Sequence, residues 1–339
     1  MLCKELTEKI EEVYPVSYAC EWDNVGLLVG RANKEVKSVY LALDVTEEVI
    51  QEAVRVKADL LITHHPLIFK GLKKISDQDF IGNRVVQLLQ HDISYYAMHT
   101  NYDVLRMADL AANRLGLQSI EVLEQTEPKE PEKGIGKSGQ FASAMTVREC
   151  CELVKERFAL SHIKVFGELD RKIQRVAVCP GSGKSVIGEA IRKKAEVLIT
   201  GDIDHHSGID AEAQGLTIMD AGHYGMEHIF IEDMRKFLEE RFEKLDIKCA
   251  PISHPFLLCS IECKMTEKKE GKQVEKQRYT VQVGKVLRQY EAGTTYEKIS
   301  EDFQAEYEND IVLVFVDNRL QELGKKLKER LCIKVCHNR

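Results

Sequence analysis

An internal repeat without gaps constrains the fold of this chain more than any other sequence feature. The alignment pairs residues 39–65, VYLALDVTEEVIQEAVRVKADLLITHH, with residues 176–202, VAVCPGSGKSVIGEAIRKKAEVLITGD, at an offset of 137 residues. Each copy consists of an apolar run, an amphipathic segment and a second apolar run. Continuous apolar runs are typical of strands in a sheet covered on both faces, so each copy predicts a βαβ unit with parallel strands. We therefore expect an α/β protein whose two pseudo-symmetric halves arose by duplication.

Two polar segments divide the rest of the chain. Residues 126–139, TEPKEPEKGIGKSG, and residues 264–278, KMTEKKEGKQVEKQR, are both expected to be exposed linkers. After the second segment, apolar runs on either side of Gly284-Lys285 predict a hairpin. A helix capped by Thr294 or Thr295 and a buried strand, IVLVFV, are expected to follow. The expected domains are a first half at 1–125, a second half at 140–263 and a small α+β domain at 279–339.

Charge and cysteine content restrict the class of protein. The net charge of the 339 residues is −7, which argues against nucleic-acid binding through a broad basic surface. The first 15 residues lack the apolar core of a signal peptide, and no window approaches the about 20 apolar residues of a membrane span. Ten cysteines without framework spacing then indicate reduced thiols in the cytoplasm. The pairs Cys259/Cys263 and Cys332/Cys336 leave zinc binding open, although neither has the C-x2-C spacing of a structural site.

Histidines and carboxylates gather in four patches beside predicted strand ends. The patches LITHHPLIF, YYAMHTNYD, GDIDHHSGIDAEA and IMDAGHYGMEHIF hold seven of the eleven histidines. Imidazole and carboxylate ligands suit Zn, Mn, Fe or Co in a hydrolytic centre. Adjacent residues of a strand point to opposite sides, so His64 and His65 can serve two ions, or one can bind an ion while the other supports its ligands. His223 and Glu227 are four residues apart and would share one face of a helix, where Glu227 can bridge two ions. The alternative is that these groups are helix caps and the polar lining of an ordinary cleft.

These patches resemble the motifs of the Nif-three-like family, whose members form dinuclear metal centres and are often named GTP cyclohydrolase I type 2 homologues. The likeness lies, in the family's order and over roughly residues 1–265, in EWDNVGLLVG, ADLLITHHPLIF, HTNYD, ITGDIDHH and DAGHYGME. It implies two α/β halves that face each other across a cleft, and a ring-shaped homohexamer with the metal pairs inside. Two divalent metal ions per chain are implied as cofactors, with His64, His65, Asp103, His223 and Glu227 as ligands.

The resemblance also implies a reaction. His99, His205 and His206 match motif positions, and we expect them around the ligands, with His99 or His205 as the catalytic proton shuttle. A metal-bound hydroxide would attack a small phosphate- or nucleotide-type substrate, and the second ion would act as electrophile. The competing hypothesis is a non-enzymatic metal-binding regulator or interaction protein.

The segment after residue 278 resembles the TGS domain, a ubiquitin-like β-grasp module of threonyl-tRNA synthetases and some bacterial nucleoside kinases. The likeness lies in VLRQYEAGTTYEKIS (286–300) and VDNRLQEL (316–323). It implies an accessory domain for RNA, nucleotide or another partner, although the acidic helix weighs against a strong RNA contact.

The stretch GSGKS at residues 181–185 raises a third hypothesis, a nucleotide triphosphatase. A Walker A loop would need glycine where this chain has Val178, and Pro180 removes a backbone N–H that a phosphate cradle uses. We therefore expect a tight strand-to-helix turn at the cleft, within reach of a substrate phosphate.

Overall fold

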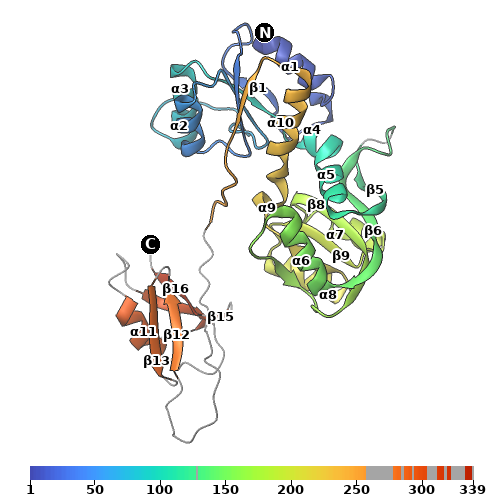
Figure 1. The fold of residues 1–339 in the computed structure, drawn as a ribbon, viewed down its shortest axis with the longest axis vertical. Helices are drawn as coiled ribbons and strands as arrows, with labels where there is room; N and C mark the ends of the chain where they lie inside the picture. Colours follow the sequence, from blue (N-terminus) through green and yellow to red (C-terminus); the bar gives the residue numbers. More distant parts are fainter. Residues whose placement is uncertain are drawn as a thin grey trace, which may run out of the picture. The chain divides into compact units, whose positions relative to one another are not determined.

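The computed structural model of the chain forms two compact units, Met1–His254 and Pro255–Arg339, which are considered separately (Figure 1). The residues described are 1–126, 129–256, 278–283, 286–291, 294–303, 311–316, 319–321 and 333–337. Unit 1 thus ends before residue 263, where composition placed the end of the second half. No helix in the described part of the chain is both long enough and apolar enough to cross a membrane.

Unit 1 contains a five-stranded sheet in the order β1-β4-β3-β2-β11. Its strands are β1 (Gly26–Val29), β2 (Ser38–Ala42), β3 (Leu60–Thr63), β4 (Ser94–Ala97) and β11 (Asp246–Cys249). All neighbours are parallel except β1, which runs antiparallel to β4.

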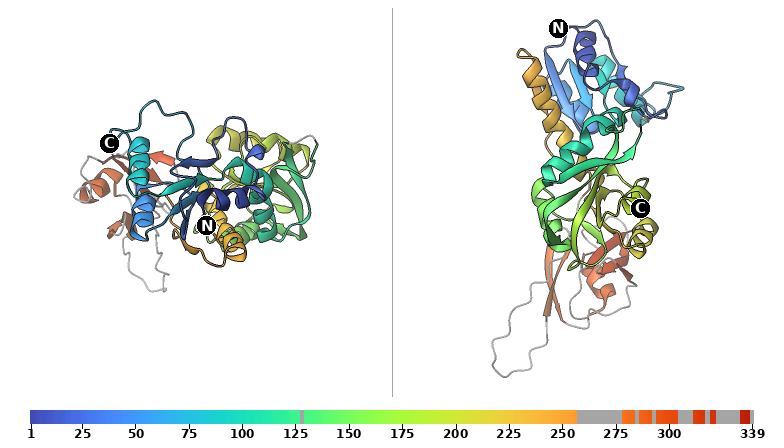
Figure 2. Two further views of the ribbon diagram at one scale, coloured as in Figure 1. Left: turned by 90° about the horizontal axis from the view of Figure 1, so that it is seen from above. Right: turned by 90° about the vertical axis from the view of Figure 1, so that its right-hand side faces the viewer.

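Helices cover both faces of this sheet (Figure 2). Alternate residues of β2 point to opposite sides: Val39 and Leu41 pack with α1 (Cys3–Glu11) and α10 (Ile229–Arg241). Tyr40 packs instead with α2 (Glu47–Arg55) and α3 (Phe80–Gln90). Burial on both faces explains why the strands are continuous apolar runs.

The second sheet of unit 1 has six strands in the order β5-β6-β8-β9-β10-β7. They are β5 (Gln118–Gln125), β6 (Gly134–Thr146), β7 (Lys164–Phe166), β8 (Lys172–Ser182), β9 (Val197–Gly201) and β10 (Thr217–Asp220). β8, β9 and β10 are parallel, and the other pairs are antiparallel. The helices of this half are α5 (Ala108–Leu115), α6 (Val147–Phe158), α7 (Ile187–Arg192), α8 (His205–Ala213) and the short α9 (His223–Glu227).

The repeat has the same strand register in both sheets. Val39 pairs with Leu60 in parallel between β2 and β3, and Val176 pairs with Val197 between β8 and β9. Both pairs are related by the offset of 137 residues that the alignment uses. The prediction of two βαβ units with parallel strands is confirmed.

The loop before the second strand also recurs in detail. Lys57 and Lys194 both adopt a left-handed backbone, with φ of 56° and 57°. The acidic residues that follow, Asp59 and Glu196, each accept two backbone N–H bonds from the start of the preceding strand. The repeat therefore preserves a loop hydrogen-bonding pattern as well as the hydrophobic pattern.

Each predicted half contributes one strand to the sheet of the other half, which the predicted domain boundaries do not allow for. β5 lies within residues 1–125 but belongs to the second sheet, and β11 lies within residues 140–263 but adds to the first. The predicted linker at 126–139 is also partly strand, because β6 begins at Gly134. A Cβ at Gly134 would lie 2.1 Å from the carbonyl oxygen of Glu124, so this glycine allows close strand approach rather than chain flexibility.

Unit 2 contains the predicted hairpin, helix and strand. β12 (Arg278–Val283) pairs with β13 (Val286–Glu291), α11 spans Tyr296–Phe303, and β14 (Ile311–Val316) pairs with β15 (Arg319–Gln321) and β16 (Ile333–His337). Thr295 caps α11 by accepting the N–H of Lys298. The turn Gly284-Lys285 lies outside the described residues, as do Cys259, Cys263 and Cys332 of the two cysteine pairs.

Candidate metal centre

Both sheets contribute side chains to one cluster in unit 1. His64 and His65 directly follow β3, and Asp103 begins a π-helical turn, Asp103–Met107, shortly after β4. His223 and Glu227 are the first and last residues of α9, after β10. All five positions lie beyond the carboxyl ends of strands, where α/β proteins assemble their sites. The cluster thus brings together the five residues that the family resemblance assigned as ligands.

Three overlapping groups of ligand atoms define this cluster. Within each group, all ligand atoms lie within 4.8 Å of one another. The groups are His64/His65/His99, His65/His223/Glu227 and His64/Asp103/Glu227. Two of the three groups share Glu227.

The two oxygens of Glu227 face different partners. Oε2 lies 2.9 Å from Nε2 of His65 and 3.0 Å from Nε2 of His223, whereas Oε1 lies 3.6 Å from Nε2 of His64. Burial alone would raise the pKa of Glu227, but the surrounding imidazoles hold it well below its ordinary value. An ionised carboxylate with one oxygen toward each group has the arrangement of a bridging ligand.

His64 and Asp103 contain buried polar atoms without hydrogen-bond partners. Nδ1 of His64 donates to the carbonyl oxygen of Met98 at 2.8 Å, which leaves a lone pair on Nε2. Neither this Nε2 nor Oδ1 of Asp103, 3.4 Å away, has a hydrogen-bond partner. Burial lowers the pKa of His64, so its imidazole is neutral, and burial with the charge of Glu227 raises the pKa of Asp103 to about 7. A cation between these atoms would satisfy both, so the residues present fit a metal ion.

Outer carboxylates orient three of the imidazoles. Nδ1 of His65 lies 2.7 Å from Asp44, and Nδ1 of His223 lies 2.7 Å from Asp202. Nδ1 of His99 lies 2.9 Å from Asp23. Each carboxylate holds the Nδ1–H tautomer and leaves Nε2 available, as partners of metal-binding histidines commonly do. The sequence alone does not show this role, although Asp44 and Asp202 follow strand ends in the repeat.

The cluster favours positive charge at its centre. Burial opposes protonation of His65, but hydrogen bonds with Asp44 and Glu227 raise its pKa to about 10. The pKa of His223 rises to about 9 against the same opposition from burial, through Glu227 and Asp202. The two Nε2 atoms lie only 3.1 Å apart. The carboxylates around these imidazoles therefore favour positive charge at the centre, which a divalent ion would supply.

The two predicted catalytic histidines lie in different surroundings. The ring of His99 is 5.2 Å from that of His64 and 5.6 Å from that of His65, and one of the three groups includes His99, so this histidine is part of the cluster. His205 is exposed at the first residue of α8, where its ring contacts His206. None of the three ligand groups found among the described residues contains His205 or His206.

The GSGKS stretch contacts the cluster through a glycine rather than through its lysine. β8 continues to Ser182, and α7 begins only at Ile187. Gly181 has φ of +75°, and a Cβ there would lie 2.3 Å from Oε1 of Glu227. Nζ of Lys184 forms an ion pair with Asp204 at 2.8 Å. Gly181 and Ser182 thus end β8, and residues 183–186 form the turn to α7 that the sequence predicted.

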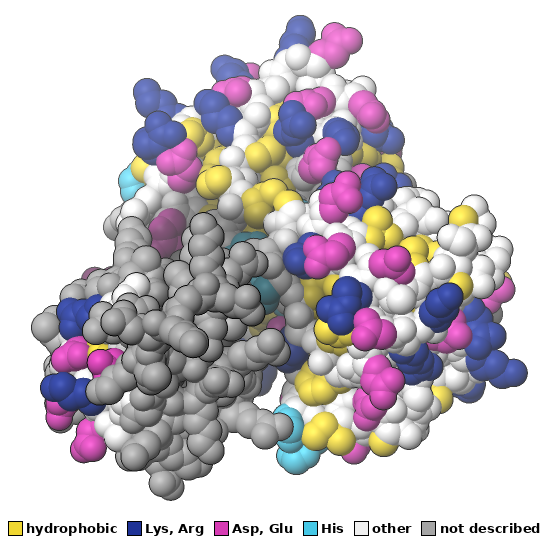
Figure 3. All heavy atoms as spheres, turned by 60° about the horizontal axis from the view of Figure 1, so that its bottom comes forward, with side chains coloured by type: hydrophobic (Ala, Val, Ile, Leu, Met, Phe, Trp, Pro, Cys, Tyr) yellow, Lys and Arg dark blue, Asp and Glu magenta, His cyan; other side chains and the backbone are white. Residues whose placement is uncertain are grey.

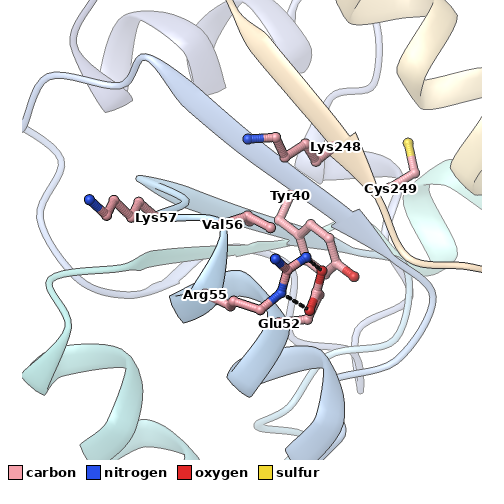
Figure 4. A pocket seen from close by; sticks show the side chains of 7 residues that line it. All are labelled: Tyr40, Glu52, Arg55, Val56, Lys57, Lys248 and Cys249. Carbon is pink, nitrogen blue, oxygen red and sulfur yellow. Dashed lines mark hydrogen bonds and ion pairs between the residues drawn. The ribbon is translucent and has the colours of Figure 1, made fainter.

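One surface cavity of unit 1 lies away from the cluster. It has a volume of about 480 Å³ and lies between the end of α2 and strands β2 and β11 (Figure 4). Its wall includes the ion pair of Glu52 and Arg55 together with Tyr40, and it contains none of the five ligands.

On the face shown in Figure 3, basic and acidic side chains of the described residues are interspersed.

Comparison with known proteins identifies relatives of unit 1. The model of the family described as Duf34/NIF3 (NGG1p interacting factor 3) matches residues 1–255. A protein of Clostridium acetobutylicum named GTP cyclohydrolase 1 type 2 homolog is 34% identical over 246 residues, which cover 72% of this chain and 92% of that protein. A protein of the same name from Streptococcus pneumoniae is also 34% identical over 246 residues, covering 71% of this chain and 91% of the relative.

Solved structures show the same fold. A Bacillus cereus protein related to NIF3 has a TM-score of 0.70 at 27% identity and covers 76% of this chain and 99% of its own. Reduced HcgD from Methanocaldococcus jannaschii has a TM-score of 0.64 at 32% identity, over 74% of this chain and 97% of its own.

Proposed function

This chain belongs to the Duf34/NIF3 family, and we propose that its unit 1 binds two divalent metal ions and acts as a metal-dependent hydrolase. One observation carries the proposal: Nε2 of His64 and Oδ1 of Asp103 are buried and lack hydrogen-bond partners, 3.4 Å apart and beside the ionised Glu227. Such atoms are rare in folded proteins because each costs about 1–3 kcal/mol. A metal ligand role explains both.

Each ion would have its own set of ligands. His64, Asp103 and Oε1 of Glu227 would hold one ion, and His65, His223 and Oε2 of Glu227 would hold the other. Imidazole and carboxylate donors suit Zn, Mn, Fe or Co. When bound, such ions supply Lewis acidity and lower the pKa of water.

His99 is the residue of this chain best placed to carry a proton. Its Nδ1 is held by Asp23, so Nε2 can accept a proton and return it. Burial would raise the pKa of Asp23, but hydrogen bonds from His99 and Thr100 lower it to about 2. Asp23 therefore stays ionised and orients the imidazole at neutral pH. We assign the proton shuttle to His99 rather than to His205, because only His99 lies beside the ligands.

The substrate class that we propose is a small phosphate- or nucleotide-type compound. Support comes from the name of the relatives, GTP cyclohydrolase 1 type 2 homolog, since GTP cyclohydrolase chemistry opens the imidazole ring of guanine. Turnover of a nucleotide panel by the metal-loaded protein, lost in Asp103→Ala, is the expected result. Two bound ions without turnover of any substrate would favour a metal-binding regulator instead.

Metal content per chain tests the centre itself. We expect about two ions per wild-type chain by elemental analysis after purification without added metal, and fewer in His64→Ala and Glu227→Gln. His91→Ala is the matched control, because His91 is an exposed histidine at the end of α3. A wild-type protein that binds no metal even after reloading would refute the proposal, and equal loss in His91→Ala would show that the effect is not specific.

Two further proposals concern assembly and unit 2. The family resemblance supports a ring-shaped homohexamer, which the molar mass in solution tests directly. The likeness of residues 279–339 to TGS domains supports an accessory role in binding RNA, nucleotide or a partner protein. A chain without these residues is then expected to keep its metal content and to lose that binding.

A further inference from the structure

Two large aromatic side chains are exposed beside His99. Trp22 is 64% exposed and Phe69 is 47% exposed. Their rings lie 5.9 Å and 5.7 Å from the ring of His99, both in edge contact at 76° and 86°. A T-shaped contact with His99 occupies at most one face of each ring, and the exposed fractions leave the rest of each ring accessible to another planar group.

The loops that carry these rings are tied to each other and to the cluster. Nδ2 of Asn24 donates to the carbonyl oxygen of Ile68 at 2.5 Å, which joins the loop of Trp22 to the loop of Phe69. Asp23 contacts His99 and also accepts two hydrogen bonds from Thr100, through its backbone N–H and its hydroxyl. The three consecutive residues Trp22, Asp23 and Asn24 thus present an exposed ring, orient His99 and fix the neighbouring loop. The loops that carry the rings are therefore fixed to each other and to the cluster before any ligand binds.

We infer that Trp22 and Phe69 bracket the planar heteroaromatic ring of the ligand whose polar end reaches the metal centre. The inference rests on the proposed function and adds the residues that would hold the ring of such a ligand. Both aromatic side chains contact His99, which belongs to the polar cluster. Small-molecule sites usually have this composition, with apolar walls and a few polar groups. Stacking on aromatic side chains tolerates any flat ring and contributes about 1–3 kcal/mol per base in nucleic-acid binding.

The test compares a ligand that has a ring with one that lacks it. Metal-loaded full-length protein is titrated by calorimetry with GTP and, separately, with inorganic tripolyphosphate. We expect GTP to bind more weakly to Trp22→Ala and to Phe69→Ala by at least about fivefold, while tripolyphosphate binds all proteins equally. Trp22→Phe should restore most of the GTP affinity. Phe80→Ala is the matched control, since Phe80 is 67% exposed but packs beside Arg84.

Trp22 offers an independent signal because it is the only tryptophan in the chain. Its fluorescence should change with GTP and not with tripolyphosphate, and Phe69→Ala should shift that titration to higher GTP concentration. Metal content is measured on every variant after titration.

The outcomes separate this inference from the proposed function. Full metal content with unchanged GTP affinity in Trp22→Ala and Phe69→Ala would overturn the inference and leave the metal centre standing. A changed molar mass in these variants, again with unchanged GTP affinity, would assign the rings to a contact between copies and also overturn it. Absence of metal from the wild type would overturn both.

Discussion

Replacing Gly181 by alanine should weaken metal binding without unfolding the protein. Gly181 has φ of +75°, and an added Cβ would lie 2.3 Å from Oε1 of Glu227. Ordinary contacts of a Cβ begin near 3.4 Å, so Oε1 must retreat by about 1 Å. Distances between a metal ion and its ligand atoms stay within about 0.2 Å of their usual values. Glu227 is buried and held by two histidines, so it has little freedom to adjust while it keeps both groups of partners.

Two costs are combined in this substitution and can be separated. An alanine in the left-handed region costs about 1–2 kcal/mol wherever it occurs. Gly116, with φ of +73° and nothing within 4 Å of the added Cβ, carries this cost alone. For a unit of this size, 1 kcal/mol lowers Tm by about 2–4 °C, so Gly116→Ala should show a modest fall in Tm with full metal content. Gly181→Ala should show a similar fall for the metal-free protein together with at least about tenfold weaker metal binding.

The assay is metal titration of the metal-free proteins, with elemental analysis of the purified forms. Tm is measured on the metal-free proteins, so that lost metal and lost fold are read separately. If Gly181→Ala binds two ions as tightly as Gly116→Ala does, then Glu227 does not bridge through Oε1 and the ligand assignment is wrong.

Three other predictions concern charge and burial. The pKa of Asp23 is about 2 when folded against 3.8 in a model peptide, so its contribution to stability is present above pH 3.8 and is lost as the pH falls towards 2. The free energy of unfolding, measured with urea, should fall between pH 5 and pH 2.5 in both proteins, but by roughly 1–2 kcal/mol more in the wild type than in Asp23→Asn. An equal fall in both proteins would contradict the assigned hydrogen bonds. Burial raises the pKa of Cys150 to about 12, so a thiol reagent at pH 7.5 should label Cys150 only after denaturation, and rapid labelling of the native protein would show that α6 opens. Arg106→Leu should lower the free energy of unfolding by about 2–4 kcal/mol, because the mostly buried Asp233 loses both hydrogen bonds from the guanidinium. Arg148→Leu should change it by less than about 1 kcal/mol, because Arg148 and Asp170 form an exposed ion pair.

Sequence reasoning was most accurate where a local pattern determines structure. The repeat predicts β2, β3, β8 and β9 because four continuous apolar runs can only be buried in a sheet with both faces covered. It does not predict β11, a strand of four residues, DIKC, with none fully buried and little apolar pattern. That strand exists because the edge of β2 is available to it, which only the assembled sheet reveals.

The glycine-rich start of β6 shows a second limit. Glycine is typical of flexible linkers and also of strands that a neighbour approaches closely, and composition cannot separate the two. Gly134 is of the second kind, since Glu124 occupies the place of its missing side chain.

The candidate site shows the same division between local and tertiary information. His64, His65 and Glu227 could be predicted because strand ends and helix spacing place them. The partners Asp23, Asp44 and Asp202 were not assigned, since their roles depend on the direction of an imidazole ring. His99 and His205 lie in equally convincing motifs, and only the fold shows which one lies beside the ligands.

The late return of the chain to its first sheet has a consequence during synthesis. β2 ends at Ala42, but the strand that covers its edge, β11, begins only at Asp246. At about 5–20 residues per second, the ribosome needs roughly 10–40 s to make the intervening chain. Throughout that time the nascent chain presents an unpaired parallel edge, the kind of surface through which polypeptides aggregate. We therefore expect this edge of β2 to be the part of the first half most prone to wrong pairing until β11 emerges.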